Sequence, residues 1–208
     1  MFDHLKRIRT AKGFGVHSPF AFNFITNVLF EKRSYYAYFD IPRYLSEKHI
    51  DTPISSVHQL SFRLVNFFRP KNVLIVGEEQ DYALPLFVYT ASPEARIICL
   101  TDQETKSKMS EICAARMEFW HEFRVEPMDA IIIDMHSLPK NCDITIENLL
   151  KISNKQTFWM IRHINAGKES RRFWKDVQND PRIALTFDMR QDGIVILNSS
   201  YYKLNYLV

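Results

Sequence analysis

The sequence predicts an α/β fold, in which helices cover both faces of a mostly parallel sheet and an antiparallel hairpin closes its C-terminal side. Three apolar runs, at 72–76, 96–100 and 130–134, indicate fully buried strands of a parallel sheet. Segments with helical spacing separate these runs, and strands that alternate with helices are typical of such a sheet. Near the end of the chain, Asp192-Gly193 separates two further apolar segments, and an Asp-Gly pair favours a hairpin turn.

The first part of the chain is expected to be a helical extension that packs on this core. Residues 1–12 carry several basic side chains and predict a short helix. A second helix is expected to begin at Ser18, whose hydroxyl accepts from the free amides of the first turn, with Pro19 in the first helical position. The aromatic stretch 35–53 is predicted to be irregular, and a further helix is predicted over 55–68.

Strands and helices alternate after this extension, so we divide the chain into an extension, residues 1–68, and an α/β domain, residues 69–208. Within the α/β domain, the expected helices cover 80–91, 103–121, 143–153 and 168–179. Besides the three buried runs, the expected strands are a short one near 123–126, one over 157–162, and the hairpin strands 183–189 and 193–198.

The composition is typical of a soluble globular protein and argues against several classes of function. Of the 208 residues, 46% are hydrophobic and 25% are charged, and a net charge of +3 is too small to indicate nucleic-acid binding. No apolar run reaches the roughly 18 residues needed to span a membrane, and the N-terminus lacks the apolar centre of a signal peptide. Three cysteines without a CxxC pair indicate a reducing, cytoplasmic location.

The turn after the first buried strand is the most informative feature of the chain. Gly77 is followed by Glu78, Glu79 and, after one glutamine, Asp81. In α/β proteins this turn usually approaches a nucleotide-like ligand, and several glycines let the ligand reach the backbone. Each carboxylate at the following helix N-terminus gains roughly 0.3–1 kcal/mol from the helix dipole and would repel an anionic ligand group. The turn therefore predicts a cofactor-binding architecture with an altered site, unless these acids simply face solvent.

Several segments, spread over nearly the whole chain, resemble one family in their order and spacing. They are GVHSPF at 15–20, RPKNVL at 69–74, MDAIIID at 128–134, and Phe173-Trp174 followed by Gly193. Together they resemble a bacterial, O-methyltransferase-like group of class I S-adenosylmethionine-dependent methyltransferase-like proteins. This resemblance implies a Rossmann-like class I methyltransferase fold with an N-terminal helical extension.

The resemblance also implies where a cofactor would bind, and the sequence departs from the family pattern there. The family has an acid in the first strand and a glycine-rich turn after it, whereas this chain has Ile75 and the acidic turn. The family offers a carboxylate to the ribose at the end of the second strand, where this chain has Thr101. These departures predict that binding of S-adenosylmethionine is weakened or lost. The positions expected to contact this cofactor are Gly77, Glu78, Asp102 and Asp134.

Asp134 and His163 are the candidate catalytic residues, because each lies where a strand is expected to end. Asp134 would hold a substrate or cofactor group, and His163 would act as a base. The structural alternative is that Asp134 caps a helix or pairs with Arg162. No metal is expected, because relatives that bind a metal carry acids where this chain has Arg162-His163, and a guanidinium repels a cation.

The sequence leaves three functions open. The first is a methyltransferase-like protein with a degenerate cofactor site, which acts in binding or regulation or has an altered activity. The second is an active O-methyltransferase-like enzyme that uses Asp102, Asp134 and His163 on an unknown small acceptor. The third is an interaction protein that forms a homodimer through its aromatic N-terminal helices or its apolar C-terminal tail, 201–208.

Overall fold

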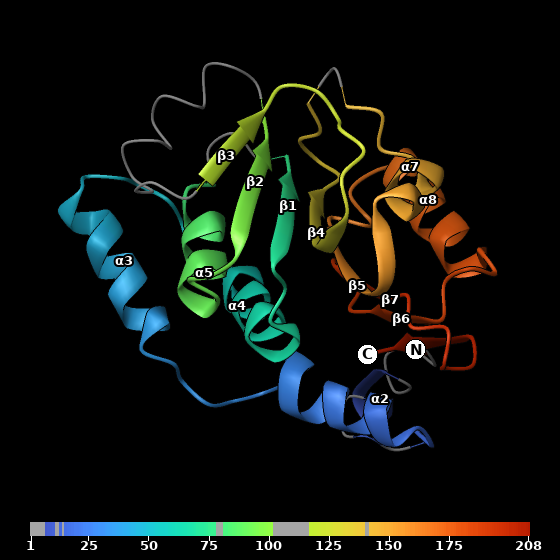
Figure 1. The fold of residues 1–208 in the computed structure, drawn as a ribbon. Helices are drawn as coiled ribbons and strands as arrows, with labels where there is room; N and C mark the ends of the chain where they lie inside the picture. Colours follow the sequence, from blue (N-terminus) through green and yellow to red (C-terminus); the bar gives the residue numbers. More distant parts are fainter. Residues whose placement is uncertain (1–6, 11–12, 14, 78–80, 102–116, 140–141) are drawn as a thin grey trace.

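A computed structural model describes residues 7–10, 13, 15–77, 81–101, 117–139 and 142–208. Within them, an eight-stranded sheet lies between two groups of helices (Figure 1). The helices α4 (Ser56–Phe68) and α5 (Ala83–Ala91) cover one face, and α7 (Ile146–Lys151) and α8 (Lys168–Asn179) cover the other. The predicted α/β architecture is confirmed.

The sheet has the strand order β3-β2-β1-β4-β5-β7-β6-β8. Neighbouring strands are parallel except at β7, which is antiparallel to both β5 and β6. The predicted C-terminal hairpin is therefore confirmed as β6 and β7. The strands are β1 (Asn72–Val76), β2 (Arg96–Leu100), β3 (Met117–Trp120), β4 (Met128–Asp134), β5 (Ser153–Arg162), β6 (Leu185–Asp188), β7 (Gly193–Ile196) and β8 (Leu204–Leu207).

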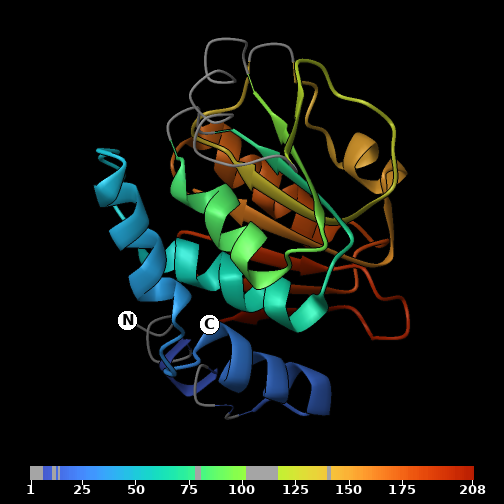
Figure 2. The same cartoon turned by 60° about the vertical axis from the view of Figure 1, so that its left-hand side comes forward.

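The apolar runs of the sequence form a sheet that is buried on both faces. Along β1, Val73 and Ile75 pack with α4 and α5, whereas Leu74 and Val76 pack with α7 and α8. Side chains alternate between the faces of a strand, so a run with apolar residues at every position fits a strand covered on both sides. Figure 2 shows the helices of the first face in front of the sheet.

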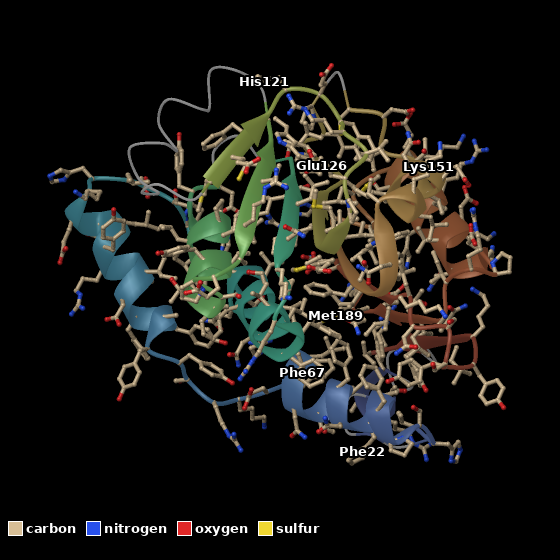
Figure 3. All side chains as sticks on the ribbon, viewed as in Figure 1. Phe22, Phe67, His121, Glu126, Lys151 and Met189 are labelled. Atoms are coloured by element: carbon tan, nitrogen blue, oxygen red, sulfur yellow. The ribbon has the colours of Figure 1, made fainter. Side chains whose placement is uncertain are left out.

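The N-terminal helices pack against the first face of the sheet near its C-terminal strands. As predicted, Ser18 caps α2 (Pro19–Phe24), and its hydroxyl accepts from the amide of Ala21 at 3.3 Å. The helix continues as a five-residue π-helix, η1 (Ile25–Leu29). The ring of Phe24 is fully buried, and its centroid lies 4.9 Å from that of Phe187 on β6. Figure 3 shows Phe67 between α4 and this helix, and Phe22 on the outer side of α2.

The third strand is not where the sequence predicts it. The segment 123–126 is a loop, and β3 covers Met117–Trp120, which was expected to end the helix 103–121. Residues 102–116 lie outside the described part of the chain. An ion pair of 2.6 Å between Arg96 on β2 and Glu118 holds this edge strand in register. This pair joins residues that are distant in sequence, so the local spacing of apolar residues, which favoured a helix here, could not predict the strand.

Two further elements lie where no element was predicted. The stretch expected to be irregular contains α3 (Ala37–Glu47), which buries Ala37, Ile41 and Leu45 although Pro42 lies inside it. The C-terminal tail forms β8, which extends the sheet by parallel pairing with β6. Among the described residues, no helix has the length and apolar character needed to cross a bilayer.

The hairpin between β6 and β7 contains a glycine that is required by packing. A Cβ atom on Gly193 would lie 2.5 Å from the indole ring of Trp174 on α8, so α8 approaches the sheet closely only because this side chain is absent. The left-handed backbone in this turn falls on Arg190, at a φ of 75°. The Asp-Gly pair therefore marks the hairpin, although the glycine does not supply its left-handed residue.

Candidate functional site

The candidate site lies at the carboxyl ends of the central strands. The chain proceeds from β1 outward to β2 and β3, and then returns to place β4 and β5 on the other side of β1. Ligands of open α/β sheets bind at such a switch point, beyond the carboxyl ends of the strands. The residues found there are Gly77, Asp81, Thr101, Asp134 and Arg162.

Gly77 has the left-handed backbone that favours glycine, and the side on which a Cβ atom would lie faces the protein interior. Its φ is 102°, and a Cβ atom placed on it would lie 3.0 Å from the Cβ of Asp134 and 3.0 Å from the carbonyl oxygen of Ser137. The missing side chain therefore lets the segment after β4 approach β1. Gly77 was predicted to contact a cofactor, and the described contacts explain the glycine without one.

Replacing Gly77 with alanine is expected to lower the free energy of unfolding by about 1–3 kcal/mol. The new methyl group would lie too close to the segment after β4, and alanine would also be strained at this positive φ. Urea unfolding of the full chain would measure this loss. Gly15→Ala is the matched control, since Gly15 also has a positive φ, 76°, but a Cβ there meets nothing within 4 Å. Equal losses in the two variants would show that the contact with the β4 loop is unimportant.

A buried ion network crosses the switch point. Arg162, at the end of β5, donates from Nη1 to Oδ2 of Asp81 at 3.0 Å, and the same nitrogen lies 3.6 Å from Oδ2 of Asp134. The relative exposures of Arg162, Asp81 and Asp134 are 5%, 8% and 2%. Asp81 was predicted to belong to an acidic turn, and its side chain points inward to meet the guanidinium. The turn residues Glu78 and Glu79 lie outside the described residues.

His58 on α4 completes this network and was missed in the sequence. Its Nδ1 accepts from the backbone amide of Ser55 at 2.9 Å, so the ring proton is assigned to Nε2. Nε2 then donates to Asp81, 2.8 Å from Oδ2. Oδ1 of Asp81 also accepts from the amide of Leu84 in the first turn of α5, at 3.1 Å. Asp81 thus joins α4, α5 and β5.

The two predicted catalytic residues lie together at the edge of the network. Nδ1 of His163 lies 2.7 Å from Oδ1 of Asp134, which also accepts from the amide of His136 at 2.7 Å. His163 has a left-handed backbone, with a φ of 57°, and its side chain is 35% exposed. The structural alternative for Asp134, a pairing with Arg162, is present as well, at 3.6 Å. Asp134 therefore holds an oriented imidazole whose other side reaches toward solvent.

A third carboxyl group lies close to this pair. Burial raises the pKa of Asp192, in the turn between β6 and β7, while the charges of Arg162 and His163 lower it in part. The switch point therefore collects three acidic side chains around one guanidinium and a partly exposed imidazole. Among the described residues, no group of three or more His, Cys, Asp or Glu side chains is arranged to hold a metal ion.

Little space is left between these side chains. The cavity bounded by Gly77, Asp81, Thr101, Asp134 and Arg162 has a volume of about 10 Å³, which is room for about one water molecule. Pockets for small molecules and cofactors usually measure about 300–1,000 Å³. This cavity by itself is too small for an adenosyl group. Asp102, predicted to hold the ribose, lies outside the described residues.

Comparison with solved structures places this geometry within a known fold. A methyltransferase from Geobacter sulfurreducens superposes with a TM-score of 0.56 at 12% identity, covering 80% of this chain and 91% of that one. An O-methyltransferase from Bacillus cereus in complex with SAH gives 0.55 at 15% identity, covering 82% and 94%. The O-methyltransferase TomG from Streptomyces achromogenes in complex with SAM gives 0.53 at 12% identity, covering 80% and 92%.

Comparisons of the amino-acid sequence with family models and with curated proteins found no match. At such low identities the superpositions establish the fold alone, and they agree with the strand order and the C-terminal hairpin described above. The chain has the Rossmann-like fold of the class I O-methyltransferases.

Proposed function

We propose that this methyltransferase-like protein has an S-adenosylmethionine site closed by its own side chains, and that it acts in binding or regulation rather than in methyl transfer. The observation that carries the proposal is the buried contact between Arg162 and Asp81, 3.0 Å long, at the switch point. The guanidinium and its carboxylate partners fill the space beyond the ends of β1, β4 and β5 with bonded side chains, and that is the space where ligands of such sheets bind.

Admitting the cofactor would also require Arg162 to leave its partners. Removing one member of a buried ion pair costs about 3–5 kcal/mol, because the other charge stays buried without compensation. A ligand would have to supply this free energy before it gained any net affinity. The cavity of about 10 Å³ and the approach of Asp134 to Gly77 support the same proposal.

Thermal unfolding in the presence of S-adenosylmethionine or S-adenosylhomocysteine tests this proposal. We expect no change in the melting temperature of the full chain at millimolar ligand. A true binder at 100 times its dissociation constant gains about 2.7 kcal/mol, or roughly 5–10 °C for a chain of this size. The SAH-binding O-methyltransferase of Bacillus cereus is the positive control for the assay. A rise of that order in this protein would contradict the proposal.

An active methyltransferase is the second candidate, and the contact between Asp134 and His163 favours it. A carboxylate that fixes one ring nitrogen leaves the other in position to accept a proton from an acceptor hydroxyl. Transfer of a labelled methyl group to small hydroxyl-bearing acceptors, lost in His163→Ala, would support this function. Equal transfer by the variant and the wild type would exclude a role for His163.

A homodimer is the third candidate. At the start of α3, its N-cap residue Tyr36 and Phe39 in its first turn are 89% and 66% exposed, and apolar surface of this kind often contacts a partner. The C-terminal tail offers β8, a strand at the edge of the sheet. Sedimentation of the full chain and of a Tyr36→Glu/Phe39→Glu variant distinguishes the two surfaces. A dimer that persists in this variant would point to the tail, and a monomeric wild type would reject this candidate.

A further inference from the structure

A groove between the N-terminal helices and α4 combines a cavity with a cluster of guanidinium groups. It lies between η1, the linker that follows it, and the C-terminal half of α4, and it has a volume of about 610 Å³. This volume is within the range of about 300–1,000 Å³ found for small-molecule sites. The groove is separate from the switch point and shares no lining residue with the small cavity there.

The charged lining of the groove is mostly positive. Arg33, Arg63 and Arg69 line it together with one acid, Glu31. The hydroxyl of Tyr35 donates to Oε2 of Glu31 at 2.7 Å, and Arg33 lies 3.4 Å from Oε1. Burial and this hydrogen bond raise the pKa of Tyr35 to about 12. The phenol therefore keeps its proton and its hydrogen bond to the Glu31 carboxylate well above neutral pH. The groove therefore has an excess of positive charge.

Arg63 maintains the shape of the groove. Its Nε donates to the carbonyl of Val28 at 2.7 Å, and its Nη2 donates to that of Leu29 at 3.1 Å. These carbonyls belong to the end of η1, where the last carbonyls of a helix have no partner within the helix. The rare π-helical turn is found frequently at functional sites. Arg63 thus fixes the end of η1 against the wall of the groove.

Arg69 and Arg33 both line the groove, and although Nε of Arg33 pairs with Glu31, its guanidinium remains open to a ligand. The side chain of Arg33 is 87% exposed. Arg69 ends α4 in the left-handed conformation, with a φ of 49°, at a position where helices usually have glycine. Within the described part of the chain, its guanidinium makes no hydrogen bond or ion pair. Such a backbone conformation persists only when its surroundings maintain it, and residues of this kind are concentrated at functional sites.

We propose that this groove binds a small phosphate monoester, with its phosphate on Arg33 and Arg69 and its apolar part against Tyr35 and Phe67. Guanidinium groups match the geometry of phosphate oxygens and bind them with charge-assisted hydrogen bonds. A dianion balances the excess positive charge better than a monoanion does. The ring of Phe67 is 39% exposed and offers a flat apolar wall. The proposal is independent of whether the switch point binds a cofactor.

Isothermal titration of the full chain with phenyl phosphate at low salt tests the proposal. We expect binding by the wild type and about tenfold weaker binding by Arg33→Gln and by Arg69→Gln, since each variant loses a charge-assisted contact. Arg172→Gln is the matched control, because Arg172 on α8 is 85% exposed and lies away from the groove; its affinity should equal that of the wild type. Arg33→Gln keeps the test decisive if Arg69→Gln does not fold.

The chemical class of the ligand is tested by three further probes. Inorganic phosphate should bind more weakly than phenyl phosphate because it lacks the apolar part, and benzoate should bind more weakly because it carries a single charge. Phenol should not bind. Equal affinities of phenyl phosphate and benzoate, or of phenyl phosphate and inorganic phosphate, would overturn the proposed class. Unchanged affinity in both arginine variants, or absence of binding at millimolar phenyl phosphate, would overturn the site itself.

Discussion

Replacing Asp81 with alanine is expected to lower the free energy of unfolding by about 3–5 kcal/mol, among the largest effects of any single substitution in this chain. The variant leaves the buried guanidinium of Arg162 without its 3.0 Å partner and removes the acceptor of His58. The amide of Leu84 also loses its acceptor in the first turn of α5. Chemical denaturation gives this loss directly. In a thermal scan it corresponds to a decrease of roughly 6–20 °C.

A surface pair and a double variant separate this effect from a general loss of charge. Asp176→Ala removes a carboxylate that is 57% exposed and 3.9 Å from Arg172, and we expect less than about 0.5 kcal/mol. Asp81→Ala/Arg162→Met removes both members of the 3.0 Å pair and should recover only part of the loss, because the buried guanidinium that lost its nearest carboxylate is also removed while Asp134 loses the same guanidinium at 3.6 Å. If Asp81→Ala were as stable as Asp176→Ala, the network would not hold the switch point closed.

Replacing Phe24 with alanine is expected to lower the free energy of unfolding by about 3–5 kcal/mol, although Phe24 lies in the N-terminal extension. The side chain is fully buried. Its ring contacts Phe187 on β6 at a centroid distance of 4.9 Å and Phe68 on α4 at 5.7 Å. The truncation leaves a cavity between the extension and the sheet. Urea unfolding followed by circular dichroism measures the loss.

The control for this prediction is Phe39→Ala on α3. Its side chain is 66% exposed, so its removal should cost less than about 1 kcal/mol. A single cooperative transition in Phe24→Ala would show that the extension and the sheet unfold together. Two separate transitions, with the second at the stability of the wild type, would contradict the expectation that α2 is part of the core.

Local patterns in the sequence predicted most of the sheet, because its central strands are buried on both faces. The runs at 72–76 and 96–100 coincide with β1 and β2, and the Asp-Gly pair marks the hairpin. Elements stabilised by neighbours were missed. The edge strand β3 depends on Arg96, and α3 is stabilised by Phe62 and Phe87 of α4 and α5 in spite of Pro42.

The sequence predicted only those residues of the candidate site that lie at or just after the end of a strand. Gly77, Asp134 and His163 were singled out because each follows or ends a strand, and the fold brings them to the same edge of the sheet. The contact between Arg162 and Asp81 joins residues 81 positions apart, so no local pattern indicates it. The Ser55-x-x-His58 spacing of a capping box was the available signal for His58, and it indicates a helix start rather than a partner for Asp81.

If the network formed by His58, Asp81 and Arg162 replaces a bound cofactor, as proposed, it also changes how the abundance of this protein responds to its surroundings. A bound cofactor protects its protein in proportion to its concentration, so scarcity of the small molecule exposes the empty form to proteolysis. A guanidinium that belongs to the same polypeptide is never diluted or depleted. Under the proposed function, the lifetime of the folded chain would be the same whatever the metabolic supply of a nucleoside.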